Sequence, residues 1–261
     1  MSAAPLAGRR ILVTRPREQA EGLARLIREA GGEPVLFPAI EIRDLPQPGA
    51  LLALVDRLEE FDLAIFVSPS AAHKALDLIR ARRPRAPWPA GLKVAAMGSG
   101  SRRELERHGL RDVIAPEAEA DSEALLATPA LAAVQGRRVV IFRGAGGREL
   151  LGETLAARGA RIEYAECYAR ALPRADAAPL LAAWARDGID AVTVSSGEGL
   201  ANLFELLGEP GRQRLRATPL FVPHERIAEA AARLGVRETI VAGPGDAQVH
   251  ARLVAYFGAR G

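Results

Sequence analysis

The sequence contains a single cysteine, Cys167, among its 261 residues. One thiol cannot form a disulfide within the chain, and it cannot supply a cysteine-based metal site. Proteins without disulfides are typical of a reducing compartment. The cysteine content therefore favours a cytoplasmic location.

Long apolar runs are also missing. No stretch approaches the roughly 18 consecutive apolar residues that a membrane-spanning helix needs. The first ten residues hold no apolar segment of the length found in secretory signal peptides. We therefore expect no membrane contact, and the cytoplasm stays the predicted location.

Lysine and aromatic residues are scarce. Lys74 and Lys93 are the two lysines, aromatic residues make up 5% of the chain, and the formal net charge is only +3. The arginines are scattered rather than gathered in a tract, whereas a nucleic-acid surface needs a basic patch and exposed aromatic side chains. A compositional bias toward arginine explains them more simply, and we expect no nucleic-acid partner.

Motifs for cofactors and metals are missing as well. The turn after Phe142 has glycines at positions 144, 146 and 147, which is not the dinucleotide spacing, and no Gly-Lys-Ser or Gly-Lys-Thr occurs. No Gly-x-Ser-x-Gly elbow of a hydrolase occurs either. The four histidines lie far apart in the sequence and no pair has ligand spacing. They are His73, His108, His224 and His250. The sequence predicts neither a cofactor nor a metal.

Apolar runs of strand length alternate with helical patterns along the whole chain. Such alternation calls for parallel sheets with helices on both faces, the α/β class. The expected strands begin near Ile11, Val35, Leu63, Val94, Val113, Val139, Ile162, Ala191, Leu220 and Thr239.

One stretch occurs twice. Asp62 lines up with Asp190 and Ser68 with Ser196, and both pairs lie 128 positions apart (190 − 62 and 196 − 68). In both copies an apolar strand ends at a serine turn and a helix follows. The sequence therefore predicts a duplicated α/β unit.

The duplication predicts two sheets of five strands. One sheet takes the five strands from Leu63 to Ile162, and the other is completed when the first two strands join the last three. We expect two flavodoxin-like parallel-sheet domains, 1–37 with 174–261 and an inserted 44–167. A two-stranded linker of 38–43 and 168–173 would act as a hinge, with a cleft between the domains where ligands of open α/β sheets bind.

Serines stand at several predicted strand ends. Ser68 before Pro69 has the pattern of an N-cap followed by proline at the first helical position. Ser195 and Ser101 each precede a glutamate by three residues, which is the capping-box spacing. Helix capping is one interpretation of these serines. The other is an anion-binding site, because small residues at a helix N-terminus let an anion approach closely. Ser70 and Ser196 belong to the same turns.

Other polar residues follow predicted strands. Arg143 and Arg148 flank the turn that contains Gly144, and their guanidinium groups could bind carboxylates. Thr14 and Arg15 have the same character at the end of the first strand. The alternatives are a surface arginine, and for Thr14 a helix cap. His224 lies at another strand-to-helix turn, where it could face the cleft or be solvated.

Tyr168 lies at the second crossing between the domains. A phenol there could donate a proton in the cleft. An aromatic side chain packed under the hinge is the alternative.

Read together, several segments resemble the uroporphyrinogen-III synthase family, and they cover nearly the whole chain in order. They are Ile11-Leu-Val-Thr-Arg-Pro, Phe37-Pro-Ala-Ile, Val67-Ser-Pro-Ser-Ala, Gly136 to Leu151, Cys167-Tyr-Ala-Arg, Val194 to Leu200 and Arg226-Ile-Ala-Glu-Ala-Ala. The resemblance implies two α/β domains with a two-stranded linker. It also implies an enzyme that converts hydroxymethylbilane, a linear tetrapyrrole, to uroporphyrinogen III with inversion of ring D and loss of water, without cofactor or metal.

The resemblance also implies roles for residues. Tyr168 is expected to assist departure of the terminal hydroxyl group. The hydroxyl turns carry over to Ser68, Ser101 and Ser196, with Arg148 and Thr14 as neighbours. We further expect a monomer in haem biosynthesis, with substrate handed over by hydroxymethylbilane synthase. The alternative is a non-enzymatic two-domain protein that closes on a small polyanion, which would not need Tyr168.

Overall fold

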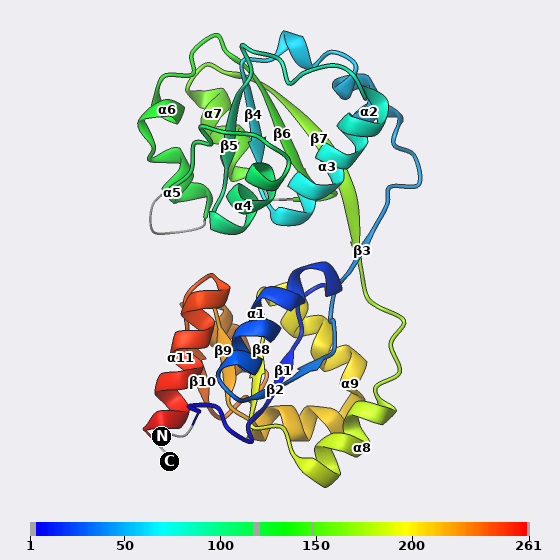
Figure 1. Cartoon of the computed structure of the whole chain (residues 1–261), viewed down its shortest axis with the longest axis vertical. Helices are drawn as coiled ribbons and strands as arrows, with labels where there is room; N and C mark the ends of the chain where they lie inside the picture. Colours follow the sequence, from blue (N-terminus) through cyan, green and yellow to red (C-terminus); the bar gives the residue numbers. More distant parts are fainter. Residues whose placement is uncertain (1–3, 117–120, 148, 260–261) are drawn as a thin grey trace. The chain divides into compact units, whose positions relative to one another are not determined.

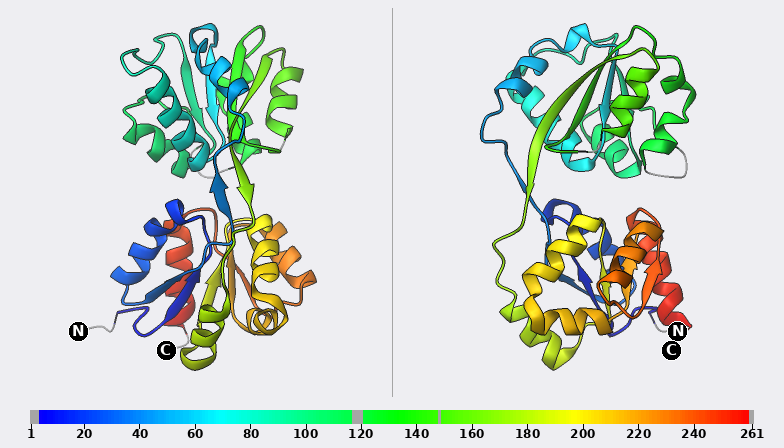
Figure 2. Two further views of the ribbon diagram at one scale, coloured as in Figure 1. Left: turned by 90° about the vertical axis from the view of Figure 1, so that its right-hand side faces the viewer. Right: turned by 180° about the vertical axis from the view of Figure 1, so that it is seen from behind.

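The computed structural model describes residues 4–116, 121–147 and 149–259 (Figure 1). The chain divides into two compact units, which we call unit 1 (Met1–Glu41 with Ala171–Gly261) and unit 2 (Ile42–Arg170). Each unit contains a five-stranded sheet. Helices cover both faces of each sheet (Figure 2). The predicted α/β class with parallel sheets is confirmed.

Unit 1 has the strand order β10-β9-β8-β1-β2, so the first two strands of the chain join the last three, as predicted. Read from β2, the chain order is 2-1-3-4-5, the flavodoxin-like arrangement. The strands are β1 (Arg10–Val13), β2 (Glu33–Leu36), β8 (Ala191–Thr193), β9 (Leu220–Val222) and β10 (Thr239–Val241). The helices are α1 (Arg17–Glu29) and α11 (Asp246–Gly258) on one face, and α8 (Ala178–Asp187), α9 (Gly197–Ala217) and α10 (Glu225–Arg233) on the other.

Unit 2 has the strand order β3-β7-β6-β4-β5. The strands are β3 (Glu41–Arg43), β4 (Leu63–Phe66), β5 (Lys93–Ala96), β6 (Arg138–Gly144) and β7 (Arg161–Ala171). Helices α2 (Gly49–Val55), α3 (Pro69–Arg82) and α4 (Ser99–Arg107) pack on one face, and α5 (Ser122–Leu126), α6 (Pro129–Ala132) and α7 (Leu150–Ala157) on the other. A short 3₁₀ helix, η1, spans Leu58–Glu60.

The strand predicted at Val113 is wrong. In the described part of this segment, up to residue 116, one isolated bridge forms, between Ile114 and Ala95. Asp112 has a left-handed φ of 53°, and Pro116 lacks the N–H that a longer ladder would need. The fifth strand of unit 2 is instead β3.

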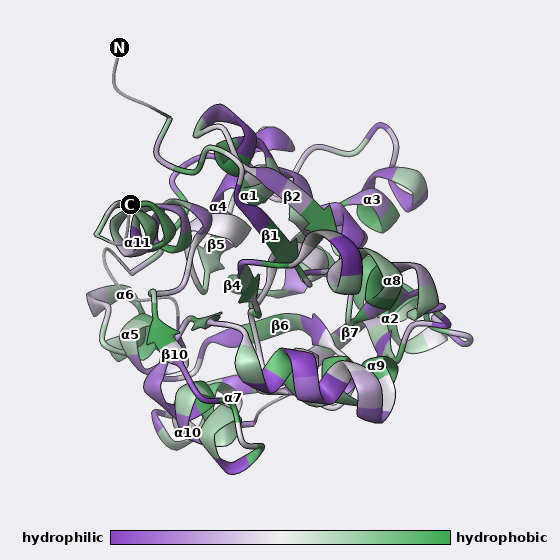
Figure 3. Ribbon diagram, turned by 90° about the horizontal axis from the view of Figure 1, so that it is seen from below, coloured by the Kyte–Doolittle hydropathy of each residue, from purple (hydrophilic) through white to green (hydrophobic). Residues whose placement is uncertain are grey.

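The cores lie between the sheets and their helices. Every residue of β4 is buried, because helices cover both faces of a parallel sheet. Figure 3 shows β4 and the end of β1 as strongly apolar, whereas the helices carry apolar and polar residues side by side. Within the described ranges, no helix is long and apolar enough to cross a membrane.

The repeat of 128 residues extends to the strand register. Ile11 pairs with Ala191 in unit 1, and Leu63 pairs with Val139 in unit 2. Val139 lies 128 positions after Ile11, and Ala191 lies 128 positions after Leu63. Strands β1 and β6 are therefore equivalent, as are β8 and β4. Each sheet combines strands from the first copy of the repeat with strands from the second.

Asp62 joins β4 to β6 at the start of both strands. Its carboxylate accepts from the main-chain N–H of Arg138 at 2.8 Å and from the guanidinium of Arg137 at 3.1 Å. The main-chain bond is the chief cause that lowers the pKa of Asp62, and Arg137 adds to it. Because the folded pKa is depressed, this stabilisation is present above the unfolded pKa of about 4 and is lost as the pH falls through the folded value.

Asp190 makes the equivalent bonds in unit 1, to the N–H of Arg10 at 2.8 Å and to Arg9 at 3.1 Å.

We expect Asp62→Ala to lower the free energy of unfolding by about 1 kcal/mol, since two charge-assisted bonds are lost at a site partly screened by solvent. Urea unfolding at pH 7 measures this change. Asp56→Ala removes an exposed carboxylate that also pairs with arginine, and it should leave stability nearly unchanged. Equal losses in both variants would contradict the prediction.

Candidate active site

Tyr168 lies near the end of β7 in unit 2 and is only 1% exposed. The ladder between β6 and β7 shifts register after Arg143, so that Gly144 pairs with Tyr168. The phenol oxygen lies 3.0 Å from Ser68 Oγ, and Arg170 donates to it at 3.3 Å. Tyr168 is therefore packed in the core of unit 2, while its hydroxyl is hydrogen-bonded to two polar side chains.

Gly144 provides the space for the ring of Tyr168. A Cβ at this position would lie 2.8 Å from Cε2 and from Cζ of the ring, and 3.1 Å from the hydroxyl. Real Cβ atoms essentially never approach that closely. The ring can lie in this orientation only because residue 144 has no side chain.

Ser68 caps α3 as predicted. Its backbone is extended, and its Oγ accepts from the N–H of Ala71 at 3.0 Å, with Pro69 at the first helical position. The same hydroxyl reaches Tyr168. Capping and contact with the phenol are therefore both functions of Ser68.

The equivalent turn of unit 1 has nearly the same geometry. Ser196 has φ −158° and ψ 159°, against −159° and 159° for Ser68, and it accepts from Gly199 N at 3.0 Å. The residue 128 positions before Tyr168 is Ile40, and its Cδ1 lies 3.6 Å from where a Gly199 Cβ would be. Unit 1 thus has an aliphatic side chain where unit 2 has a phenol. Of the two equivalent positions, the pair of hydroxyl groups is therefore in unit 2.

Arg143 is 8% exposed and holds the turn that follows β6. It donates to the carbonyl of Gly147 at 3.1 Å and pairs with Glu166 at 3.4 Å, and its guanidinium lies 3.9 Å from the ring centroid of Tyr164. Burial raises the pKa of Tyr164, and the charge of Arg143 partly offsets this. Arg143 is not a solvated surface arginine. Its neighbour in the prediction, Arg148, lies outside the described residues.

Cys167 is buried beside Tyr168. Burial raises the pKa of its thiol to about 12, and the thiol donates to the carbonyl of Ala165 at 3.2 Å. A thiol that stays protonated at neutral pH is a poor nucleophile. Cys167 is therefore a packing residue.

Thr14 and Arg15 lie at the carboxyl end of β1 in unit 1. Thr14 is not the helix cap, and Arg15 is not the solvated arginine, that the sequence left as alternatives. Thr14 caps no helix, because α1 begins after Pro16; its hydroxyl donates to the carbonyl of Thr193 at 2.8 Å. Arg15 is paired with Asp246, and both side chains are 17% exposed. Arg15 is thus engaged in an ion pair rather than solvated.

Both predicted capping boxes are wrong. The residue that caps α9 is Ser196 rather than Ser195, which is exposed. The N-cap of α4 is Gly98, so Ser101 lies inside the first turn, where it is buried. In both cases the residue with extended backbone that precedes the helix is not the serine that lies three residues before a glutamate.

The structure divides the predicted site residues between the units. Unit 2 holds Ser68, Ser70, Ser101, Arg143, Gly144 and Tyr168, and unit 1 holds Thr14, Arg15, Ser195, Ser196 and His224. Ser70 is buried in the first turn of α3, and a Cβ on Gly100 would lie 3.0 Å from the ring of Pro69, so the turns of Ser70 and Ser101 adjoin. His224 takes the N-cap position of α10 at a strand-to-helix turn, as predicted, without a side-chain capping bond.

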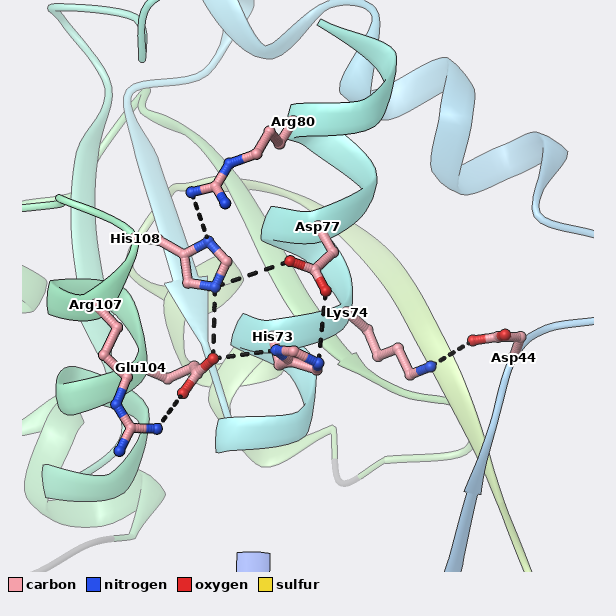
Figure 4. Close-up of polar contacts among 8 residues, drawn as sticks. All are labelled: Asp44, His73, Lys74, Asp77, Arg80, Glu104, Arg107 and His108. Carbon is pink, nitrogen blue, oxygen red and sulfur yellow. Dashed lines mark hydrogen bonds and ion pairs between the residues drawn. The ribbon is translucent and has the colours of Figure 1, made fainter. Parts of the chain in front are cut away.

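A group of polar side chains on α3 and α4 was missed. His73 and His108 lie together with Asp77 and Glu104 (Figure 4). The inference that all four histidines are far apart is therefore wrong for this pair. The available signal was an acid and a histidine four residues apart on each helix, which places both on one helix face.

The fold and the contacts of Tyr168 define an α/β protein with a buried hydroxyl pair at the carboxyl edge of a parallel sheet. Within the α/β class, the chain belongs to the uroporphyrinogen-III synthase family, because the family model described as uroporphyrinogen-III synthase HemD matches residues 21–246.

Relatives of known name agree with this family. The chain is 37% identical to the uroporphyrinogen-III synthase of Salmonella typhimurium and 35% identical to that of Escherichia coli. Both alignments cover 90% of this chain and 96% of the relative.

Solved structures agree in fold. A mutant uroporphyrinogen III synthase from the extremely thermophilic bacterium Thermus thermophilus superimposes with a TM-score of 0.59 at 19% identity, over 97% of this chain and 100% of that chain. The enzyme from Helicobacter pylori gives a TM-score of 0.61 at 12% identity, over 95% of this chain and 99% of that chain.

Proposed function

We propose that this protein is a uroporphyrinogen-III synthase, which cyclises hydroxymethylbilane to uroporphyrinogen III with inversion of ring D and loss of water. The observation that supports this best is the buried phenol of Tyr168, hydrogen-bonded to Ser68 and Arg170. A binding protein for a small polyanion would not need it. The proposed reaction draws on side chains of the chain and on no cofactor.

Tyr168 is the proposed acid. The terminal hydroxyl of the substrate leaves as water when a proton is delivered to it, and a phenol is a suitable donor. Ser68 and Arg170 would hold the phenol oxygen and stabilise the charge that remains on it. Since Tyr168 is almost fully buried, the substrate must displace a neighbour to reach it. Arg170 is exposed and lies over the ring, so its movement would open that path.

The substrate carries eight carboxylates, and most of the catalysis would be positioning. The proposed contacts are arginine side chains, hydroxyl groups and N–H groups at helix N-termini, which all suit carboxylates. The residues proposed to bind substrate are Thr14, Arg15, Ser68, Ser70, Ser101, Arg143, Gly144, Arg148, Ser195, Ser196 and His224.

The domain boundaries stay as proposed from the sequence, with domains 1–37 plus 174–261 and 44–167. In this proposal the segments 38–43 and 168–173 contain a hinge that lets the domains close on the substrate. Because Tyr168 is in the core of unit 2, the part of the second segment that bends would lie after Arg170. We also propose a cytoplasmic monomer that receives its substrate from hydroxymethylbilane synthase.

The product isomer tests the function. Incubation with freshly generated hydroxymethylbilane, followed by oxidation and chromatography, should give mainly uroporphyrin III. Spontaneous closure without protein gives isomer I and serves as the control. Isomer I alone in the presence of folded protein would contradict the proposal and favour the polyanion-binding alternative.

A further inference from the structure

Two pairs of metal-ligating side chains face each other across α3 and α4. His73 and Asp77 are four residues apart on α3, and Glu104 and His108 are four residues apart at the end of α4. Side chains at this spacing lie on one face of a helix, the arrangement that binds zinc in helical metal sites. Each helix thus supplies one imidazole and one carboxylate (Figure 4).

The ligand atoms are already close to one another. One atom each from His73, Asp77 and His108 can be chosen so that all lie within 4.8 Å of one another. His73 Nε2 lies 3.5 Å from Asp77 Oδ2, and His108 Nε2 lies 3.9 Å from Asp77 Oδ1. A metal with ligand distances of about 2.0–2.2 Å needs these atoms somewhat over 3 Å apart. Small rotations of the exposed side chains of His73 and Asp77 would reach that separation.

Glu104 is placed to orient His73. Its Oε1 lies 3.1 Å from His73 Nδ1, the ring nitrogen on the side away from Asp77. An imidazole that binds a metal through one nitrogen usually donates its other N–H to a carboxylate, which fixes the tautomer and the ring orientation. The side chain of Glu104 is 14% exposed and that of His108 is 12% exposed. Surrounding protein therefore restricts the movement of these two of the four side chains.

The alternative to a metal site is a cluster held together by ion pairs and hydrogen bonds alone. Two neighbouring arginines, Arg107 and Arg80, contact the cluster. Arg107 contacts the second oxygen of Glu104 at 3.2 Å. Oε1 of Glu104 lies 3.1 Å from His73 Nδ1 and 3.5 Å from His108 Nε2, and a metal bound to His108 Nε2 would replace the second of these contacts. Arg80 lies 3.3 Å from His108 Nδ1. When His108 binds a metal through Nε2, its ring proton is on Nδ1. Arg80, which is itself a hydrogen-bond donor, would then have to move away from Nδ1. Arg80 is exposed, so the move meets no packing.

We propose that His73, Asp77 and His108 bind one divalent cation of borderline softness, of the Zn²⁺ class, and that Glu104 positions His73. Two imidazoles and a carboxylate are a ligand set that such cations favour. The bound ion would fasten α3 to α4. These helices carry the turns with Ser68, Ser70 and Ser101, so the site would stiffen the part of unit 2 next to Tyr168 without contacting it.

Calorimetric titration of the full chain, after treatment with a chelator and its removal, tests the site with Zn²⁺ alone. We expect one site per chain in the wild-type protein. His108→Ala should weaken binding at least about 100-fold, and Glu104→Gln should weaken it about 10–100-fold, because a second-shell partner is lost. His224→Gln removes an imidazole elsewhere and is the matched control, with unchanged affinity.

A second measurement keeps the result independent of folding. Co²⁺ bound in a tetrahedral site gives visible absorption bands, and these should appear with wild-type protein and be missing with His73→Ala. The thermal midpoints of the metal-free variants establish that they fold. Wild-type protein that binds no Zn²⁺, or a folded His73→Ala/His108→Ala variant that binds it as tightly as wild type, would overturn the proposal.

Discussion

Tyr168→Phe should lower turnover by about 10²–10⁴-fold, the range that a positioned general acid contributes. The substitution keeps the ring that fills the core and removes only the hydroxyl held by Ser68 and Arg170. The cap of α3 persists, because Ser68 still accepts from Ala71. Initial rates of uroporphyrinogen III formation measure the loss, and a KM that changes little would place it in the chemical step.

Tyr164→Phe is the matched control. Tyr164 lies on the same strand, four residues before Tyr168, and packs with the core cluster on the other face of the sheet. Its substitution should leave turnover near the wild-type level, and both variants should unfold at similar urea concentrations. Near-normal turnover of Tyr168→Phe would remove the phenol as the acid, whereas equal losses in both variants would indicate a general effect of this strand.

Most strands were predictable because they are short apolar runs between turn residues, and β1, β4, β6, β8 and β9 are largely buried. The duplication then assigned the first two strands to the sheet of the last three, since Asp62 and Asp190 mark equivalent strand starts. Strand β3 lies within 38–43, the segment expected to be one strand of a two-stranded linker. Its place at the edge of the unit 2 sheet has no local signal, because it has three residues and its partner β7 begins more than a hundred positions later. The strand at Val113 failed because Pro116 ends an otherwise suitable apolar pattern.

The site was predictable where chemistry is local. Ser68 before Pro69 is a cap that the sequence alone identifies. The contact between Ser68 and Tyr168 spans 100 residues and depends on the register shift beside Gly144, which no local pattern encodes. His73 and His108 meet because α3 packs against α4, and only the spacing within each helix was visible in the sequence.

Gly144→Ala should have the second large effect. The added methyl group would lie 2.8 Å from two carbons of the Tyr168 ring, so the ring must move by several tenths of an ångström. Overpacking of this kind costs about 1–3 kcal/mol of stability. A displaced catalytic group can cost about 100-fold in rate. Steady-state rates and urea unfolding measure both changes. Gly91→Ala is the control, because nothing lies within 4 Å of an added Cβ there, and it should leave rate and stability nearly unchanged.

The double variant Gly144→Ala/Tyr168→Phe separates displacement of the phenol from general damage to unit 2. If Gly144 acts on turnover through the position of the Tyr168 hydroxyl, then once that hydroxyl is absent the extra methyl group has little further effect. The double variant should therefore be about as slow as Tyr168→Phe alone, so that the two rate effects are far from additive. Multiplied losses would contradict this coupling and would mean that Gly144 contributes by another route, such as close approach of the substrate to its main chain.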